Sequence, residues 1–306
     1  KVRAFHRPSS SLIGLEGLPV EHALGDLTQP ASVRAAMTDV EVVFHTAAML
    51  GKPNQPERMI AVTVGGTRAV LEAAHEAGVR RVIHTSSVAA LGVPMPPPSP
   101  TAEPVSINEA HTWNERPERW RYGHAKYIAE LQVQEAVARG LDAVIVNPAV
   151  VLGPRDLNRV SGEVIVRVAR GQVPVSTDGG LNVVHIADVV DGHLAALERG
   201  RTGERYILGG ENLTHRAFLA LIAEVTGRRP PRWLLPGVWL GKLTFLVKML
   251  DDTNLLPIHS EALNRAGRYF YYDTQKAHLE LGLPAPRPAR LAIKQAYAWY
   301  RAAGII

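Results

Sequence analysis

The chain has 306 residues, of which 46% are hydrophobic and 21% are charged, and these values are ordinary for a soluble globular protein. It contains no cysteine, which excludes disulfides, cysteine nucleophiles and zinc–thiolate sites and is compatible with a reducing cytoplasm. The formal charge of +5 comes from scattered basic residues, so nucleic acid is not an expected partner.

The first half of the chain alternates short β-branched runs with helical patterns. Such alternation predicts βαβ units, that is, a parallel sheet with helices on both faces. We therefore predict a doubly wound, Rossmann-type α/β domain over residues 1–158. Its predicted strands are Val2–His6, Val20–Ala23, Val42–His45, Val82–Thr85 and Ala143–Val146, and its predicted helices lie near Pro30–Met37, Pro56–Ala77 and Arg119–Arg139.

The second half, residues 159–306, changes to a mostly helical pattern. We predict a smaller substrate-binding domain there, from which a segment of about 182–210 returns to the first domain. Lysines interrupt the apolar stretch 234–250, so we predict a buried or lid helix and no membrane-spanning segment. The predicted strands are Val183–Ile186 and Tyr206–Leu208, and the predicted helices are His215–Thr226, Val238–Leu250, Ser260–Ala266, Thr274–Leu281 and Pro288–Ala302.

Tyr122 and Lys126 are four residues apart in "RYGHAKYIAE", within a predicted helix. This spacing puts both side chains on one helix face, one turn apart. A nearby ammonium stabilises a phenolate and lowers the pKa of the phenol from about 10. Such a tyrosine exchanges a proton with an alcohol or a ketone near neutral pH. Two surface residues of a helix often have the same spacing by chance. The neighbouring motifs therefore decide whether Tyr122 and Lys126 are read as a catalytic pair.

Small, hydroxyl or turn-forming residues follow several of the predicted strands. The carboxyl ends of parallel strands face the ligand crevice of such a sheet, so these residues are candidates for binding. A serine there can bond the same substrate oxygen as Tyr122, and alanines let an extended ligand lie against the backbone. The residues are Gly25-Asp26-Leu27, Thr46-Ala47-Ala48, Thr85-Ser86-Ser87 and Asn147-Pro148.

Taken in order, "GDL", "VFHTAA", "HTSSVAALG", "YGHAK", "NPAVVLGPRD" and "NVVHIADVVDGHLAALERG" resemble the extended short-chain dehydrogenase/reductase family, or NAD-dependent epimerase/dehydratase superfamily. The most similar branch holds dihydroflavonol reductases, 3β-hydroxysteroid dehydrogenases and hopanoid-associated sugar epimerases. The resemblance implies an NAD(P)-dependent oxidoreductase that transfers a hydride between the nicotinamide cofactor and a carbinol or ketone carbon of a small molecule. A nucleoside-diphosphate-sugar epimerase or dehydratase and a non-catalytic cofactor-sensing protein stay open as alternatives.

The same resemblance implies a role for each matching residue. Tyr122 is then the catalytic acid/base, Lys126 lowers the tyrosine pKa and binds the nicotinamide ribose, and Ser87 holds the substrate oxygen. The implied cofactor-binding residues are Asp26, Leu27, Ala47, Ala48, Thr85, Lys126 and Pro148. Thr63 departs from the family, because many members carry there an asparagine that positions the lysine through water. No histidine pattern indicates a metal site, so no metal is predicted.

The predicted strand Val2–His6 is followed by "RPSSS", without the acidic residue that binds the ribose 2′-hydroxyl in NAD-preferring relatives. Arg7 would instead pair with a 2′-phosphate. We therefore predict NADP(H) as the preferred cofactor, with NAD(H) as the alternative. The expected location is the cytoplasm, and a homodimer is one assembly that we allow for.

In the family, a strand, a GxxGxxG turn and a helix come before the strand that "KVRAFHR" resembles. No such glycine cluster occurs in this sequence. We therefore expect an amino-terminally truncated fragment that lacks the first strand and the Gly-rich turn and binds cofactor poorly. We also expect Val2–His6 and Val20–Ala23 to have no neighbour that joins them to Val42–His45.

Overall fold

The computed structural model describes residues 1–49, 55–97, 99, 102–237 and 267–306. Its centre is a sheet of four parallel strands in the order β3-β4-β5-β9. These strands are β3 (Val42–His45), β4 (Arg81–Thr85), β5 (Ala143–Pro148) and β9 (Arg205–Leu208). The predicted helices Val238–Leu250 and Ser260–Ala266 lie outside the described residues.

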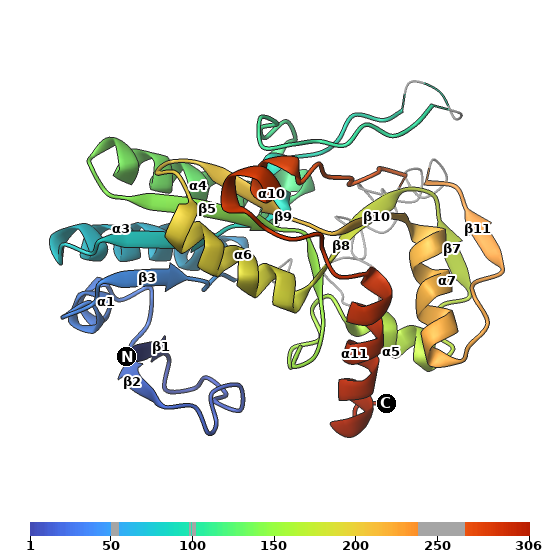
Figure 1. Cartoon of the computed structure of the whole chain (residues 1–306), viewed down its shortest axis with the longest axis horizontal. Coiled ribbons are helices and arrows are strands. Elements are labelled where there is room, and N and C mark those ends of the chain that lie inside the picture. The colour runs from blue at the N-terminus through green and yellow to red at the C-terminus, as the bar shows by residue number, and fades with distance from the viewer. Residues whose placement is uncertain (50–54, 98, 100–101, 238–266) are drawn as a thin grey trace.

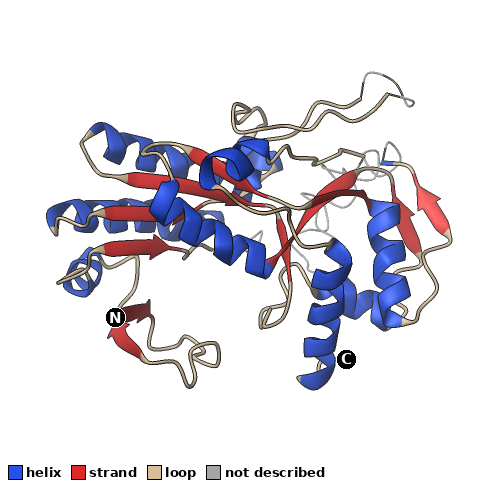
Figure 2. Cartoon of the chain, in the orientation of Figure 1, coloured by secondary structure: helices blue, strands red, loops and turns tan. Residues whose placement is uncertain are grey.

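Helices cover both faces of this sheet (Figure 2). Side chains alternate along a strand, so Ala143 and Ile145 of β5 face α1 (Pro30–Ala36), α3 (Gly66–Glu76) and α4 (Arg121–Ala138). Val144 and Val146 face α6 (Ile186–Arg199) and α10 (Gln275–Leu281). Burial on both faces explains why β5 is apolar without alternation, and it confirms the predicted doubly wound fold.

The predicted helix Pro56–Ala77 is one helical run with an irregular middle. It consists of α2 (Pro56–Ile60), the π-helical turn η1 (Ala61–Gly65) and α3. Thr63 lies in this π-helical turn and is buried, with 1% of its surface exposed. The residue that departs from the family pattern is therefore part of the core behind β3.

The strands β1 (Val2–His6) and β2 (Val20–Leu24) form a separate parallel pair (Figure 1). In the described part of the chain neither strand pairs with β3, which agrees with the expectation from the sequence. Arg3 attaches the pair to the rest of the molecule, since its guanidinium donates to the Ala36 carbonyl at 2.9 Å and to the Thr38 carbonyl at 2.6 Å. Phe5 packs against the core under α1.

The remaining elements form a second core beside the central sheet. β8 (Gly180–His185) pairs in parallel with β6 (Val150–Leu152) and antiparallel with β10 (Glu211–Thr214), while β7 (Val175–Thr177) pairs with β11 (Trp233–Leu235). The helices α5 (Glu163–Ala169), α7 (His215–Thr226) and α11 (Ala289–Ala302) contribute to this core. The sequence predicts α7 with its observed bounds, but it does not predict the three- and four-residue strands β6, β7, β10 and β11 or the helices α5 and α6.

Candidate active site

The predicted site residues outside α4 lie at or just after the carboxyl ends of parallel strands. Arg7 follows β1, and Asp26 and Leu27 follow β2 after one glycine. Ala47 and Ala48 are exposed just beyond β3, Thr85 and Pro148 are the last residues of β4 and β5, and Ser87 comes two residues after β4. This is the edge at which open parallel sheets bind ligands.

Tyr122 and Ser87 are brought together by close packing of α4 on the loop after β4. Ser87 caps the short helix η2 (Val88–Leu91), and its hydroxyl accepts a hydrogen bond from the Ala89 amide at 3.2 Å. A Cβ at Gly123 would lie 2.8 Å from the Ala89 carbonyl oxygen, so only glycine allows α4 to approach this closely. As a result, the Ser87 side chain lies close enough to the Tyr122 phenol to favour its ionised form.

Burial raises the pKa of Tyr122 above its usual value, and the nearby Ser87 hydroxyl partly opposes this effect. The ring lies beside an apolar cluster that includes Trp113, Trp120 and Phe270. The sequence predicts a pKa lowered by Lys126, and that direction is wrong for this structure. The reason is that desolvation of the phenol dominates, while the ammonium of Lys126 points to a backbone carbonyl.

Lys126 is 3% exposed, and its ammonium donates to the Thr85 carbonyl at 2.8 Å. Burial lowers the pKa of Lys126 to about 8, and the nearby carboxylate of Glu130 acts in the opposite direction. At neutral pH the lysine is thus a buried cation close to the end of β4.

Thr85 is held from the opposite face of the sheet by His193 of α6. The Nδ1 atom of His193 lies 2.7 Å from the Val189 carbonyl oxygen, which only accepts, so Nδ1 donates. The Nε2 atom is then left to accept the hydroxyl proton of Thr85 at 2.8 Å. His193 was not identified from the sequence, although it lies within the motif "DVVDGHLAALERG".

Glu130 was not identified from the sequence, and Asn147 was named there only as one of the residues at a strand end. Glu130 lies four residues after Lys126 and is 4% exposed, and Asn147 of β5 is fully buried. Their amide–carboxylate hydrogen bond measures 2.6 Å. The helical period puts Glu130 on the face of Lys126, and Asn147 is a polar residue in an apolar run, so both signals were present in the sequence.

A pair of buried histidines lies behind these residues. His45 and His84 occupy neighbouring positions on β3 and β4, with ring centroids 5.2 Å apart. The Nε2 atom of His45 is 3.0 Å from the Thr67 hydroxyl, whereas neither ring nitrogen of His84 has a hydrogen-bond partner among the described residues. Burial lowers the pKa of His45 to about 3 and that of His84 well below its ordinary value.

The residues predicted at the adenine end differ in accessibility. Asp26 accepts hydrogen bonds from the backbone and side chain of Thr28, which hold its pKa below the usual value, and the charge of Arg7 acts in the same direction. Arg7 is exposed. The side chain of Leu27, in contrast, is partly buried and packs against the core and Gly66.

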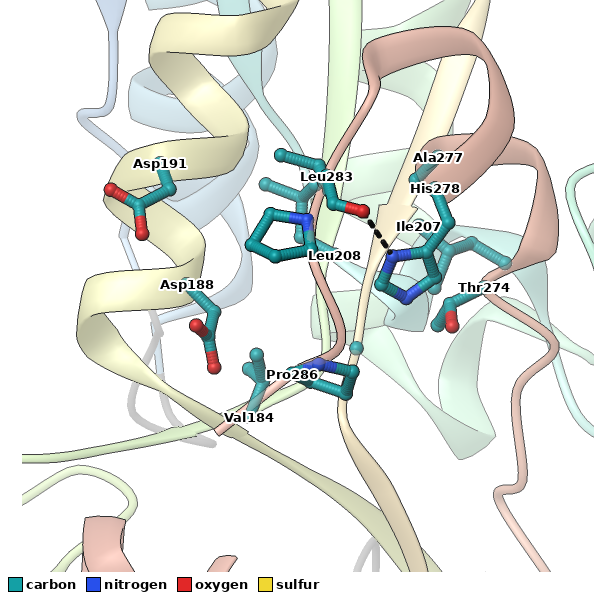
Figure 3. Close-up of a pocket in the computed structure, with 12 residues that line it drawn as sticks. Val184, Asp188, Asp191, Ile207, Leu208, Thr274, Ala277, His278, Leu283 and Pro286 are labelled. Carbon is teal, nitrogen blue, oxygen red and sulfur yellow. Dashed lines mark hydrogen bonds between the residues drawn. The ribbon is translucent and has the colours of Figure 1, made fainter. Parts of the chain in front are cut away.

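A small cavity of about 20 Å³ lies away from these residues (Figure 3). It is lined by Asp188 and Asp191 of α6 and by the segment that carries His278 and Pro286. Arg287 donates to Asp188 and, at 3.0 Å, to Asp191, so these carboxylates fasten the segment before α11. None of Ser87, Tyr122 and Lys126 lines the cavity.

Over residues 1–49, 55–97, 99, 102–237 and 267–306, no cluster of three or more histidine, aspartate or glutamate side chains is arranged to hold a metal ion. Within the same ranges, no helix combines the length and the apolar character needed to cross a bilayer.

Comparisons with known proteins show the family of the chain. The model of the NAD dependent epimerase/dehydratase family matches residues 3–209. The chain is 36% identical to sterol demethylase protein B of Methylococcus capsulatus, over the whole chain and 92% of that protein. It is 34% identical to a putative dihydroflavonol 4-reductase of Synechocystis, over the whole chain and 89% of that protein.

Among solved structures, the crystal structure of gox2253 superposes with a TM-score of 0.85 at 35% identity, covering 99% of this chain and 91% of the other. The match extends over both cores of the fold, so the similarity is not confined to the dinucleotide-binding half. The chain therefore belongs to the NAD dependent epimerase/dehydratase family, and it is an NAD(P)-dependent oxidoreductase of the extended short-chain dehydrogenase/reductase type.

Proposed function

We propose that the protein reduces a ketone of an apolar or mixed small molecule, or oxidises the matching carbinol, with Tyr122 as the catalytic acid/base. The observation that carries this proposal is the grouping of Tyr122 and Ser87 at the carboxyl edge of the sheet, one helical turn from the buried Lys126. The name of the Synechocystis relative, a putative dihydroflavonol 4-reductase, supports a reductase.

The residues at this edge fit a nicotinamide cofactor. Lys126 has three N–H donors, and among the described residues one of them is used, by the Thr85 carbonyl. The buried hydroxyl of Ser86 has no partner in the described part of the chain. Ala47 and Ala48 are small and exposed, which leaves room beside the backbone. When bound, the nicotinamide supplies or accepts the hydride.

On this proposal, the protein groups handle the substrate oxygen and its proton. The Ser87 hydroxyl donates a hydrogen bond to the substrate oxygen, and Tyr122 passes a proton to the same oxygen as negative charge develops on it. Because burial raises the pKa of Tyr122, the side chain is a phenol at neutral pH, which suits proton donation during ketone reduction. The aromatic cluster of Trp113, Trp120 and Phe270 excludes water from one side of Tyr122.

The alternative, a nucleoside-diphosphate-sugar epimerase, needs free basic residues for a diphosphate. Three basic residues of the second segment could serve, namely Arg159, Arg167 and Arg268. Arg159 and Arg167 both pair with Glu163, at 3.6 and 3.2 Å, and Arg268 donates to the Pro94 carbonyl at 3.2 Å. A diphosphate would have to compete with these contacts.

For the cofactor, we propose a preference for NADP(H), because Arg7 is exposed beside Asp26 at the end of β1 and carries the charge that a 2′-phosphate needs. We also propose that residues 1–158 bind the cofactor and that 159–306 bind the substrate, with the strand β9 of the second segment lying in the first sheet. The cytoplasmic location and the homodimer stay predictions.

The test is Tyr122→Phe, assayed by NADPH oxidation over a panel of aromatic, steroidal and flavonoid ketones. Turnover should fall by a factor of about 10² to 10⁴, while the thermal unfolding temperature stays close to that of the wild-type protein. Tyr127→Phe, on the same helix, is the matched control and should keep wild-type turnover. Near-full turnover by Tyr122→Phe on any accepted ketone would refute the assignment.

A further inference from the structure

We propose that Glu130 is a positioning residue of this site, which fixes the loop carrying Ser87 relative to the helix carrying Tyr122 and Lys126. This inference rests on the proposed function, because it assigns Glu130 a task in the same reaction. Glu130 touches neither Ser87 nor Tyr122 directly; it acts through Asn147 and on the ammonium of Lys126.

The contacts form a continuous chain from α4 to the loop after β4. The Oε1 atom of Glu130 accepts from the Asn147 side-chain amide at 2.6 Å, and the same amide nitrogen donates to the Ser87 carbonyl at 3.0 Å. An amide NH₂ group has two hydrogens, so one serves each partner. Asn147 is thereby a bridge between Glu130 and the backbone of Ser87.

The other carboxylate oxygen is held as firmly. The Oε2 atom of Glu130 accepts from the Arg205 guanidinium at 3.1 Å. Arg205 also donates to the Glu109 carbonyl at 2.9 Å and to the His111 carbonyl at 2.9 Å, so its position is set by backbone. Charge-assisted hydrogen bonds in a buried setting are strong and directional, which makes the network rigid.

Burial makes the network sensitive to any loss of a partner. Glu130 is 4% exposed and Asn147 is fully buried, while 21% of the Arg205 side chain is exposed, toward an open hollow of about 600 Å³. A glutamine at position 130 has one acceptor oxygen, which cannot serve both Asn147 and Arg205; when that oxygen turns to the charged Arg205, the second hydrogen of the Asn147 amide is left buried. The amide is then free to turn, and the Ser87 backbone loses its fixed position.

Glu130 also acts on Lys126, four residues before it on the same helix face. Its negative charge opposes the burial that lowers the pKa of the ammonium to about 8. The other ionisable side chains that face Lys126 in the described residues are His45 on β3 and His84 on β4, and Tyr122 lies one turn away on α4. Burial keeps all three of these uncharged at neutral pH. Glu130 therefore supplies the charge that keeps Lys126 protonated.

The experiment compares Glu130→Gln with Asp142→Asn. Asp142 forms a partly buried ion pair of 2.7 Å with Arg81, at the opposite end of β4 from the site. Glu130→Gln should lower kcat about tenfold or more with less than a threefold change in KM. It should also move the alkaline limb of the kcat–pH profile to lower pH by about half a unit or more, because Lys126 loses its counter-charge. Asp142→Asn should leave that limb in place.

A conservative variant separates the charge from the contact. Glu130→Asp keeps the negative charge but is one methylene shorter, so it should restore the alkaline limb and not the full kcat. An unchanged limb and unchanged kcat in Glu130→Gln would overturn the inference. If Tyr122→Phe loses turnover in the same assays, the proposed function stands even though this inference has failed.

A second readout needs neither cofactor nor substrate. Because the pKa of Lys126 is lowered on folding, from 10.5 to about 8, the unfolded chain binds more protons in between, and stability rises with pH across this window. In Glu130→Gln the rise should begin at lower pH. Neither Lys126→Met nor the double variant Lys126→Met/Glu130→Gln should show this rise, and their curves of stability against pH should have the same shape. Retention of the shift in the Lys126→Met background would overturn the inference.

Discussion

The buried histidine pair predicts how the stability of the protein depends on pH. His84 is 1% exposed and carries no hydrogen bond to any described residue. Its substitution by leucine therefore removes no such contact and fills a similar volume. At pH 8, where histidine is neutral in the folded and the unfolded chain, His84→Leu should be as stable as the wild-type protein or more so.

The effect should grow in acid. The ordinary pKa is 6.5, and burial depresses it to about 3 for His45 and well below 6.5 for His84. Below pH 6.5 the unfolded chain binds protons that the folded chain excludes, so stability is lost as the pH falls. Between pH 8 and pH 5 each such histidine costs about 2 kcal/mol, or about 4 kcal/mol for the pair. His84→Leu should halve this loss.

Urea unfolding followed by the fluorescence of the five tryptophans measures this difference. With an m-value of about 3 kcal/mol per molar urea, the urea midpoint of His84→Leu minus that of the wild-type protein should be about 0.7 M larger at pH 5 than at pH 8. His75→Gln, at an exposed position of α3, should keep the wild-type change in midpoint. The reasoning is refuted if the midpoints of His84→Leu and the wild-type protein differ by the same amount at both pH values.

Two further substitutions test the site. Lys126→Met removes a buried cation whose pKa is lowered from 10.5 to about 8. Below pH 8 this shift destabilises the folded protein by about 3 kcal/mol. Because the substitution also removes the hydrogen bond to Thr85, its net effect should be to raise the free energy of unfolding in urea by about 2 kcal/mol at pH 7 and by much less at pH 10. The variant should have no turnover. A lower unfolding free energy at pH 7 would contradict this. Arg7→Ala should weaken NADP(H) binding about tenfold or more and leave NAD(H) binding nearly unchanged, as measured by fluorescence titration; tighter binding of NAD(H) than NADP(H) by the wild-type protein would contradict the proposed preference.

The elements that the sequence predicted well carry local signals. The helix α7 has its predicted bounds because Thr214 caps its first turn, accepting from the Ala217 amide at 3.1 Å, and Gly227 ends it with a φ of +68°. The strand β5 opens with four consecutive apolar residues, 143–146. The candidate catalytic residues were found in the same way, since Tyr122 and Lys126 share one short motif.

What the sequence did not predict depends on contacts between distant parts of the chain. The direction of the Tyr122 pKa follows from burial against Trp113, Trp120 and Phe270, and no local pattern reports that packing. The bridge from Glu130 to Asn147 spans 17 residues, and its link to Arg205 spans 75. The strand β10 reads "ENLT", and it becomes a strand because β8 offers it an antiparallel edge.

The π-helical turn η1 makes the length of the helical run formed by α2, η1 and α3 critical. A π-helical turn holds one residue more than an α-helical turn, so it is what a single-residue insertion in a helix leaves behind. Thr63 within the turn accepts from the Met49 amide at 3.2 Å, and Thr67 just after it lies 3.0 Å from the His45 ring. Removing one residue from Ala61–Gly65 would restore regular α-helix and rotate one side of the turn by about 100° relative to the other. The two threonines could then no longer serve the loop after β3 and the His45 ring together, so a one-residue deletion should be far more damaging here than in an ordinary helix.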